Sequence, residues 1–503
     1  MNALILLLFV SVSFGFDTYW FLKIKGNHVL NVDNSSIIVK IKTINNNKLS
    51  IISDLNVFKE GVVEATITYY NIFSTKNVIH NMFSKVNTEN ILLFEKDAPI
   101  KMDYIKETNN VKKRYKSTNK NDINISNCRV APSDSETSNA LGYTNGFFSW
   151  GLDIITKRNL TQTGTFCPAN GLKGDDIHVF VLDSGFGTPD GFNYSRIFRD
   201  YDAYVSSNNT NYTLDFWGHG TPIAGLIGSD IYGVAPNTNL HIYKVLNDTG
   251  YTTLGILLEA LEYLESTNYT NGIVSISITM YKQDTTVNMT NAVYNVMRTL
   301  IDQKGFIFIV AAGNSGLDFN QLGGFPAMFG TRSGSNGVLT VGYLTSGITK
   351  AMNSNYGSNM GMLAPGTAII SCGLSGNLSE LYSGSSFATP IVSGVLAIYF
   401  QNYKNNNTIT ILGMLISDSV KDRIYNIERY SKSPNRVVYI GDFNVENPAP
   451  PTIEPLPDYG IAIISFLSVL SGIMLIVIII IFGKGTKVAI KNGTKFTKID
   501  KKI

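Results

Sequence analysis

The sequence predicts an α/β body built on a parallel sheet with helices on both faces, preceded by a small α+β domain and followed by one transmembrane helix. Three observations support this architecture. Apolar strand patterns alternate with helical patterns over residues 143–443. Shorter strand patterns lie nearer the N-terminus. The 22 residues of Ile461–Phe482 carry no charge, which is typical of a membrane span.

Length, charge and cysteine content restrict the class of protein. A chain of 503 residues can form several domains with a large core. A net charge of +3 with 16% charged residues is too balanced to suggest a nucleic-acid partner. Three cysteines, Cys128, Cys167 and Cys372, allow one intramolecular pair and have no zinc-ligand spacing. The core must therefore be stabilised mainly by ordinary packing.

The two ends of the chain predict its topology. Residues 1–15 predict a signal peptide, because the apolar run Ala3–Val12 is too short to span a bilayer. Residues 461–482 are long enough for a transmembrane helix, with a buried helix as the alternative. Seven lysines follow in the basic tail, residues 483–503, and basic residues stay cytoplasmic. We therefore expect a single-pass type I membrane protein whose body lies in the secretory lumen or at the cell surface.

The body is expected to stand on a stalk and to be a glycoprotein. Residues 444–460 are rich in proline, which favours a stiff, extended chain. Asn-x-Ser/Thr sequences are compatible with glycosylation in the lumen. They begin at Asn34, Asn124, Asn159, Asn193, Asn208, Asn211, Asn247, Asn268, Asn288, Asn377 and Asn406.

The part of the chain before the main body divides into two regions. Residues 16–103 predict a small α+β domain with several strands and one short helix. Residues 104–142 predict an exposed linker, because they are rich in lysine and asparagine and poor in apolar residues. The basic triplet Lys112–Arg114 is either a processing site or an ordinary feature of such a linker. The main body then extends over residues 143–443.

Four polar residues end strands or begin helices of the main body, where open α/β sheets collect reactive groups. Asp183 ends the strand IHVFVLD, and His219 lies between two glycines before a helix of small residues. Asn314 follows the apolar strand FIFIVAAG, and Ser386 begins an apolar helix that contains Pro390. Each alone could be a turn residue or a helix cap. Together they predict an orienting carboxylate, a base, an amide donor and a nucleophile.

The motifs VLDSG, GHGTPIAG, AAGNSG and GSSFATP resemble the four signatures of subtilisin-like serine proteases, the subtilase family, of the proteinase-K and subtilisin type. The resemblance covers residues 143–400 and implies a subtilisin-like fold and peptide-bond hydrolysis through an acyl-enzyme. It assigns Ser386 as the nucleophile, His219 as the base and Asp183 as its orienting acid. Asn314 and the N–H of Ser386 form the implied oxyanion hole.

The resemblance also implies an autoprocessed zymogen. The stretch ILLFEKDAPIKM is similar to the last strand of the family's inhibitory propeptides, so residues 16–103 are expected to inhibit the enzyme. Self-cleavage is expected between about Lys101 and Tyr143. The chemistry needs no cofactor, and although structural calcium is common in the family, no ligands are assigned here. The expected partners are protein or peptide substrates, the chain's own propeptide and a membrane, but no nucleic acid.

The sequence departs from the family where the substrate channel is expected. Ser277, Ile278 and Thr279 occupy the segment that lines the channel by resemblance, and Thr279 and Met280 replace a pair of glycines. Their side chains are expected to narrow or reshape the pocket for the residue before the scissile bond. The acidic residues of kexin-type pockets are not recognisable, so dibasic cleavage is not expected. The alternative function is a catalytically silent membrane glycoprotein that uses the protease fold for binding.

Overall fold

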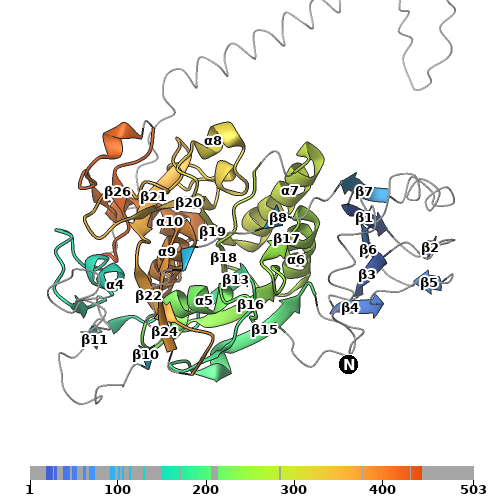
Figure 1. The fold of residues 1–503 in the computed structure, drawn as a ribbon, viewed down its shortest axis with the longest axis horizontal. Helices are drawn as coiled ribbons and strands as arrows, with labels where there is room; N and C mark the ends of the chain where they lie inside the picture. Colours follow the sequence, from blue (N-terminus) through green and yellow to red (C-terminus); the bar gives the residue numbers. More distant parts are fainter. Residues whose placement is uncertain are drawn as a thin grey trace, which may run out of the picture. The chain divides into compact units, whose positions relative to one another are not determined.

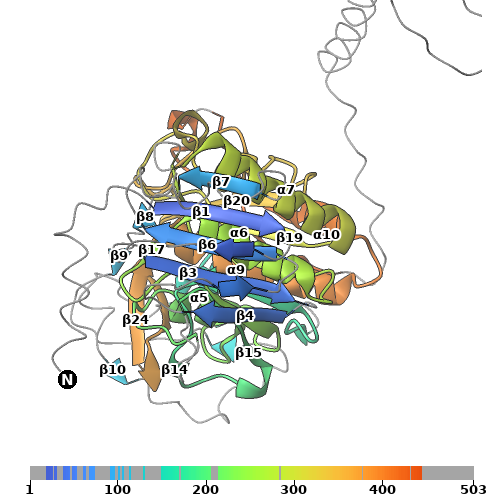
Figure 2. The ribbon, with the colours of Figure 1, turned by 90° about the vertical axis from the view of Figure 1, so that its right-hand side faces the viewer.

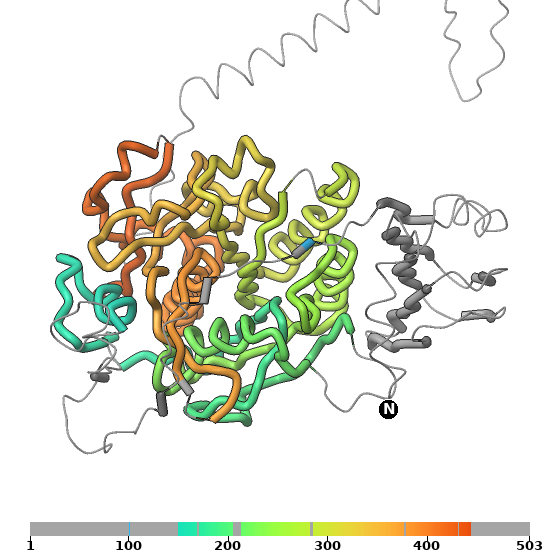
Figure 3. Tube along the Cα trace, in the orientation of Figure 1, coloured from blue at the N-terminus to red at the C-terminus, as the bar shows by residue number. Residues whose placement is uncertain are grey.

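The structure, a computed structural model, describes a main body over residues 149–443 (Figure 3). It also describes several short strands before this body. Within the main body it leaves out residues 169–170, 205–212, 282–284, 377 and 431. The predicted signal peptide, stalk, transmembrane helix and tail lie outside the described residues. In the part that is described, none of the helices combines the length and the apolar character that a membrane span requires.

A nine-stranded sheet forms the centre of the main body (Figure 1). In spatial order its strands are β15 (Ile197–Asp202), β16 (Asn239–Lys244), β13 (His178–Asp183), β18 (Ile273–Ile276), β19 (Ile307–Ala311), β20 (Val338–Leu344), β21 (Met360–Pro365), β26 (Arg436–Val437) and β25 (Val420–Lys421). Neighbouring strands are parallel except for the edge pair β25 and β26. The predicted mainly parallel sheet is confirmed.

Helices cover both faces of this sheet because its strands are apolar on both sides. In β13, Val179 and Val181 belong to one hydrophobic core, whereas Phe180 and Leu182 belong to a second core. The first core contains residues of α5 (Gly220–Gly228), α9 (Ser385–Asn402) and α10 (Thr408–Asp418), together with the short helices α4 (Trp150–Ile154) and α8 (Phe319–Leu322). The second contains residues of α6 (Leu254–Ser266) and α7 (Val287–Lys304), on the other side of the sheet in Figure 1.

The strands nearest the N-terminus form sheets of their own. Antiparallel pairing joins five of them side by side in one sheet, seen in Figure 2, and two more in a separate pair. The sheet contains, in order, β4 (Lys48–Ser53), β3 (Ile38–Asn45), β6 (Ile67–Phe73), β1 (Tyr19–Lys25) and β7 (Ile91–Lys96), and the pair contains β2 (His28–Leu30) and β5 (Gly61–Val63). The short helix predicted in residues 16–103 lies outside the described residues.

Short strands between residues 100 and 130 pair with strands of the main body. The pairs are β8 (Ile100–Lys101) with β17 (Tyr251–Thr252), β9 (Ile105–Lys106) and β10 (Lys113–Arg114) with β24 (Leu378–Ser383), and β11 (Arg129–Val130) with β12 (Thr165–Phe166). Within residues 104–142, which are predicted to form an exposed linker, β9 and β10 each pair with β24. Main-chain pairing with a strand edge requires no apolar side-chain pattern, so hydropathy does not reveal it.

The cysteines of the main body have two different states. Cys167 is disulfide-bonded, whereas Cys372 is a free thiol. Cys372 lies in β22 (Ile369–Cys372), with its Sγ 3.4 Å from the carbonyl oxygen of Thr221 in α5. Burial raises the pKa of the Cys372 thiol to about 12, so we interpret it as an unreactive packing residue.

Two histidines and a carboxylate form a polar chain across β13, β16 and β15. His178 Nδ1 is 2.8 Å from His241 Nε2, and His241 Nδ1 is 2.6 Å from Asp200 Oδ2. Burial, and then the neighbouring His241, lower the pKa of His178 below its ordinary 6.5, against the opposing effect of Asp176 and Asp200. The ring of Tyr269 packs against His178, with centroids 5.2 Å apart. The folded protein therefore disfavours a charged His178.

Acidification is expected to destabilise the fold through His178. The folded state binds a proton at His178 less readily than the unfolded state does. Neutral His178 therefore makes its full contribution to stability above the unfolded pKa of 6.5, and this stability is lost as the pH falls below that value. The melting temperature measured between about pH 7.5 and about pH 5.5 should fall, and His178→Gln should make the fall smaller. An unchanged slope in His178→Gln would show that another group titrates.

Candidate active site

The carboxyl end of β13 and the N-terminus of α5 bring Asp183 and His219 together. His219 Nδ1 is 2.7 Å from Asp183 Oδ1, and each side chain is only 1% exposed. Glycine at position 220 allows this approach, because a Cβ there would collide with the carbonyl oxygen of Gly185. An imidazole whose Nδ1–H donates to a carboxylate keeps Nε2 as a proton acceptor. The pair can therefore act as an oriented base.

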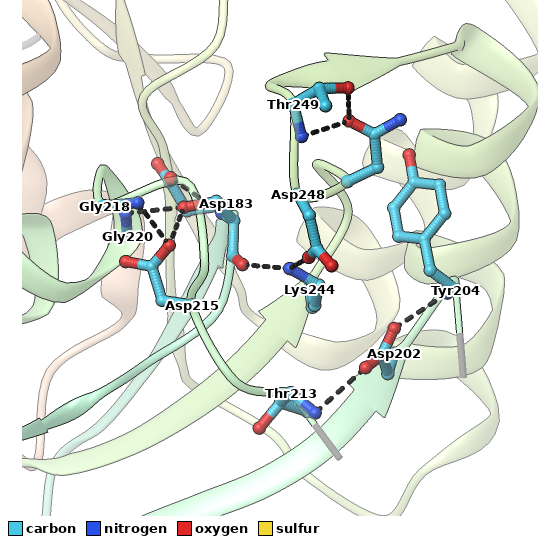
Figure 4. A network of polar contacts seen from close by, with 12 residues as sticks. Asp183, Asp202, Tyr204, Thr213, Asp215, Gly218, Gly220, Lys244, Asp248 and Thr249 are labelled. Carbon is cyan, nitrogen blue, oxygen red and sulfur yellow. Dashed lines mark hydrogen bonds and ion pairs between the residues drawn. The ribbon is translucent and has the colours of Figure 1, made fainter. Parts of the chain in front are cut away.

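Asp215 connects the turn after β13 to the start of α5 (Figure 4). Its Oδ1 accepts hydrogen bonds from Ser184 Oγ at 2.8 Å and from Gly218 N–H at 2.7 Å. Its Oδ2 accepts from the N–H and the Oγ1 of Thr221 at 2.9 and 2.6 Å. Ser184 Oγ also accepts from the N–H of Gly220 at 2.8 Å. This network fixes the first turn of α5 and with it the imidazole of the base.

Lys244 supports the same turn from the neighbouring strand. Parallel pairing places Lys244 of β16 opposite Asp183 of β13. Its Nζ donates to the carbonyl oxygen of Ser184 at 2.6 Å and lies 3.0 Å from Asp248 Oδ1, as Figure 4 shows. The Lys244 side chain is 5% exposed and that of Asp248 is 58% exposed. A buried cation therefore holds the main chain next to the orienting carboxylate.

Ser386 lies in the first turn of α9, and Pro390 shapes this turn. Proline has no N–H, so the carbonyl of Ser386 lacks its usual helical partner four residues later. Ser277 Oγ donates to that carbonyl at 2.8 Å, and Ser386 Oγ donates to the carbonyl of Ser277 at 3.0 Å. This reciprocal pair joins the first turn of α9 to the chain that follows β18.

The Ser386 hydroxyl is directed at Ser277 and not at the imidazole in the described structure. His219 is nevertheless close to this turn, because its ring contacts the ring of Phe387, the next residue, with centroids 5.4 Å apart. Rotation about the Cα–Cβ bond moves the hydroxyl between staggered positions without moving the helix. Hydrogen bonds of catalytic residues commonly form only when substrate is bound. The arrangement thus brings Asp183 and His219 together and places the turn that contains Ser386 beside them.

Asn314 follows β19 and is held beside α9 by Ser385. Its Oδ1 accepts from the N–H of Ser385 at 2.8 Å and from Ser385 Oγ at 2.9 Å. Because the amide oxygen is engaged in this way, the amide Nδ2 is the end that remains to donate. The first N–H groups of α9 have no carbonyl partner within the helix. Asn314 and this helix N-terminus can together stabilise an oxyanion.

The three residues predicted to bind substrate have different surroundings. Ser277 contacts Ser386 as described. Ile278 is fully buried in the core shared with α6 and α7. Thr279 is 8% exposed, and its Oγ1 donates to the carbonyl of Ala311 at 3.0 Å. Across the described residues, no group of three or more His, Cys, Asp or Glu side chains is arranged to hold a metal.

The sequence patterns do not reveal the residues that position the site. These residues are Ser184, Asp215, Lys244 and Ser385. Ser184 and Ser385 adjoin predicted catalytic residues, and Asp215 lies just before the GHG motif. This closeness to the motifs is the only sequence feature that could have indicated their roles. Their roles depend on contacts between distant segments, and a single sequence does not show such contacts.

Comparison with known proteins gives consistent matches. The sequence profile of the subtilase family matches residues 174–435. An extracellular serine proteinase of Thermus sp. (strain Rt41A) is 30% identical over 292 residues, which cover 58% of this chain and 66% of that proteinase. An alkaline proteinase of Hapsidospora chrysogena is 31% identical over 309 residues, which cover 60% of this chain and 70% of that proteinase. The crystal structure of a cold adapted subtilisin-like serine proteinase is 29% identical and matches with a TM-score of 0.50, covering 58% of this chain and 97% of that chain.

Proposed function

This chain belongs to the subtilase family, and on that premise we propose that it is a serine endopeptidase that hydrolyses peptide bonds of proteins. The observation that carries the proposal is the buried Asp183–His219 pair, 2.7 Å apart, beside the helix that begins at Ser385 and contains Ser386. An oriented base, a hydroxyl at a helix N-terminus and an adjacent amide donor are the groups that acyl transfer requires.

The proposed reaction uses only side chains and main-chain groups of this protein. Ser386 Oγ attacks the substrate carbonyl carbon, and His219 Nε2 takes the hydroxyl proton. Asp183 keeps the ring oriented and stabilises its positive charge. Asn314 Nδ2 and the N–H of Ser386 stabilise the negative oxygen of the tetrahedral intermediate. The imidazolium then protonates the leaving amine, and water activated by the same base hydrolyses the acyl-enzyme.

We extend the proposal to a zymogen in which residues 16–103 act as an inhibitory propeptide. Two main-chain pairings near the site support this extension. β8 pairs with β17, and β9 pairs with the end of β24, where Ile105 lies opposite Ser383, three residues before Ser386. A segment of the chain held by such pairing competes with an extended peptide for the same main-chain groups.

We also extend the proposal to membrane attachment through residues 461–482. The support is the uncharged apolar run together with the lysine-rich residues that follow it. In this arrangement the enzyme is a type I membrane glycoprotein with its catalytic body in the secretory lumen or at the cell surface.

A fluorophosphonate probe tests the proposed activity, because it reacts with a serine that a neighbouring base activates. We expect the processed protein to be labelled and Ser386→Ala to remain unlabelled, with peptide mapping placing the adduct on Ser386. Processed, folded protein that takes no label would contradict the proposal. That outcome would favour the catalytically silent membrane glycoprotein, which uses the same fold for binding.

A further inference from the structure

Two chain segments flank the nucleophile at the carboxyl edge of the sheet. Residues 277–281 continue from β18, and residues 312–315 continue from β19, which pairs with β18 through Ile276 and Val310. The first segment contacts Ser386 through Ser277, and the second contacts Ser385 through Asn314. The turn that contains the nucleophile is therefore attached to both segments.

The position of the reacting carbonyl follows from the proposed function, on which this inference rests. A carbonyl carbon attacked by Ser386 Oγ, with its oxygen toward Asn314, has to lie beside the turn that both segments contact. In the pose that this inference assumes, the side chain of the residue that carries this carbonyl lies between the two segments. Whatever occupies that space decides which residue can precede the scissile bond.

Side chains of this protein already bridge the space. Thr279 Oγ1 donates to the carbonyl of Ala311 at 3.0 Å, which joins one segment to the other. Tyr281 OH is 2.9 Å from Ser315 Oγ and makes a second bridge. Asn355 Nδ2 donates to Tyr281 OH at 3.1 Å and so supports this bridge. Each bridging hydroxyl therefore has a partner on the opposite segment.

The bridges are packed as well as hydrogen-bonded. A methyl group added at Gly313 would lie 3.1 Å from Thr279 Cγ2 and 3.1 Å from Tyr281 OH, and would collide with Asn355 Nδ2. These distances are shorter than ordinary contacts between non-bonded carbon atoms. The space beside Gly313 is thus filled by the protein itself.

The first segment is also prevented from moving outward. The N–H of Met280 donates to the carbonyl of Phe325 at 2.8 Å, and the N–H of Phe325 donates to the carbonyl of Met280 at 2.7 Å. Both side chains are fully buried in the second core. Opening the space would require breaking this pair together with the Thr279 and Tyr281 bridges.

We propose that Thr279 and Tyr281 restrict the enzyme to substrates with a short side chain before the scissile bond, namely Gly, Ala or Ser. A leucine or phenylalanine there would have to displace the Thr279 side chain from its carbonyl partner. Thr279 is expected to contribute most, because its side chain is buried and its hydroxyl bonds a main-chain carbonyl of the other strand. Tyr281 adds the second bridge, to Ser315.

Peptide substrates that differ only at this residue test the proposal, using protein already shown to take the fluorophosphonate label. We expect kcat/KM for Ala to exceed that for Phe by about 100-fold, the scale of steric discrimination in apolar pockets. Thr279→Gly removes the bridge and should raise kcat/KM for Phe relative to Ala by about 10-fold or more. Thr279→Val keeps the bulk and loses the hydroxyl, so it should retain most of the discrimination.

The outcomes separate this proposal from the proposed function. Labelled wild-type enzyme that cleaves after Phe or Leu as fast as after Ala would overturn the steric restriction and leave the serine mechanism in place. Labelled Thr279→Gly with unchanged selectivity would overturn the role of Thr279, provided that its melting curve shows a folded protein. Failure of the wild type to take the label would count against the proposed function itself.

Discussion

Replacing His219 with glutamine is expected to lower kcat by about 10⁶-fold, the size of the loss when the triad histidine of subtilisin is removed. A glutamine amide can still donate to Asp183, which keeps the buried carboxylate paired and the fold intact. It has no ring nitrogen that could accept the proton of Ser386. Hydrolysis of a peptide substrate and a thermal melt, measured on the same preparation, separate loss of chemistry from loss of folding.

The sheet supplies a matched control for this experiment. His241 Nδ1 is 2.6 Å from Asp200 Oδ2, and the His241 ring is buried, so the pair has the same chemical form as the predicted acid–base pair. His241→Gln should therefore leave kcat per folded molecule close to that of the wild type. A comparable loss of activity in both variants would contradict the assignment of His219 as the base.

The predictable part of the fold is the part with long apolar patterns. β13, β19 and α6 follow from runs of apolar residues with strand or helix periodicity, and α7 ends at Lys304 because Gly305, with a φ of +70°, caps it. The edge strands β25 and β26 have two residues each, too few to show a period. Their pairing is set by tertiary contacts, so local patterns could not predict it.

The sequence motifs single out the proposed reacting groups of the candidate site but not the residues that support them. Asp183 and His219 stand out because each lies in a short motif at the end of a strand or the start of a helix. Lys244 acquires its role only from strand register, which places it opposite Asp183. His178 and His241 lie in different strands, and only the pairing of these strands joins them to Asp200 in a polar chain. The contacts of Lys244, His178 and His241 therefore depend on strand register and on pairing between distant segments, which a single sequence does not show.

Replacing Asp183 with asparagine is expected to lower kcat by about 10⁴-fold while the protein stays folded. Asp183 Oδ1 accepts from His219 Nδ1 and from the N–H of Ser184, both at 2.7 Å. An asparagine with its oxygen at this position keeps the ring in place but no longer stabilises the imidazolium. In the opposite orientation, the NH₂ group of the asparagine lies against His219 Nδ1 and the N–H of Ser184. This orientation favours the His219 tautomer that carries its proton on Nε2. Either orientation obstructs proton transfer from Ser386.

Asp200→Asn is the matched control, because it neutralises the carboxylate of the other aspartate–histidine pair on the same sheet. Its kcat should stay near that of the wild type, whereas Asp183→Asn should lose activity at an unchanged KM, as expected for an interaction made in the transition state. An Asp183→Asn enzyme that kept more than about a tenth of wild-type kcat would show that the charge beside His219 contributes little to catalysis. The base would then depend mainly on the positioning network around Asp215.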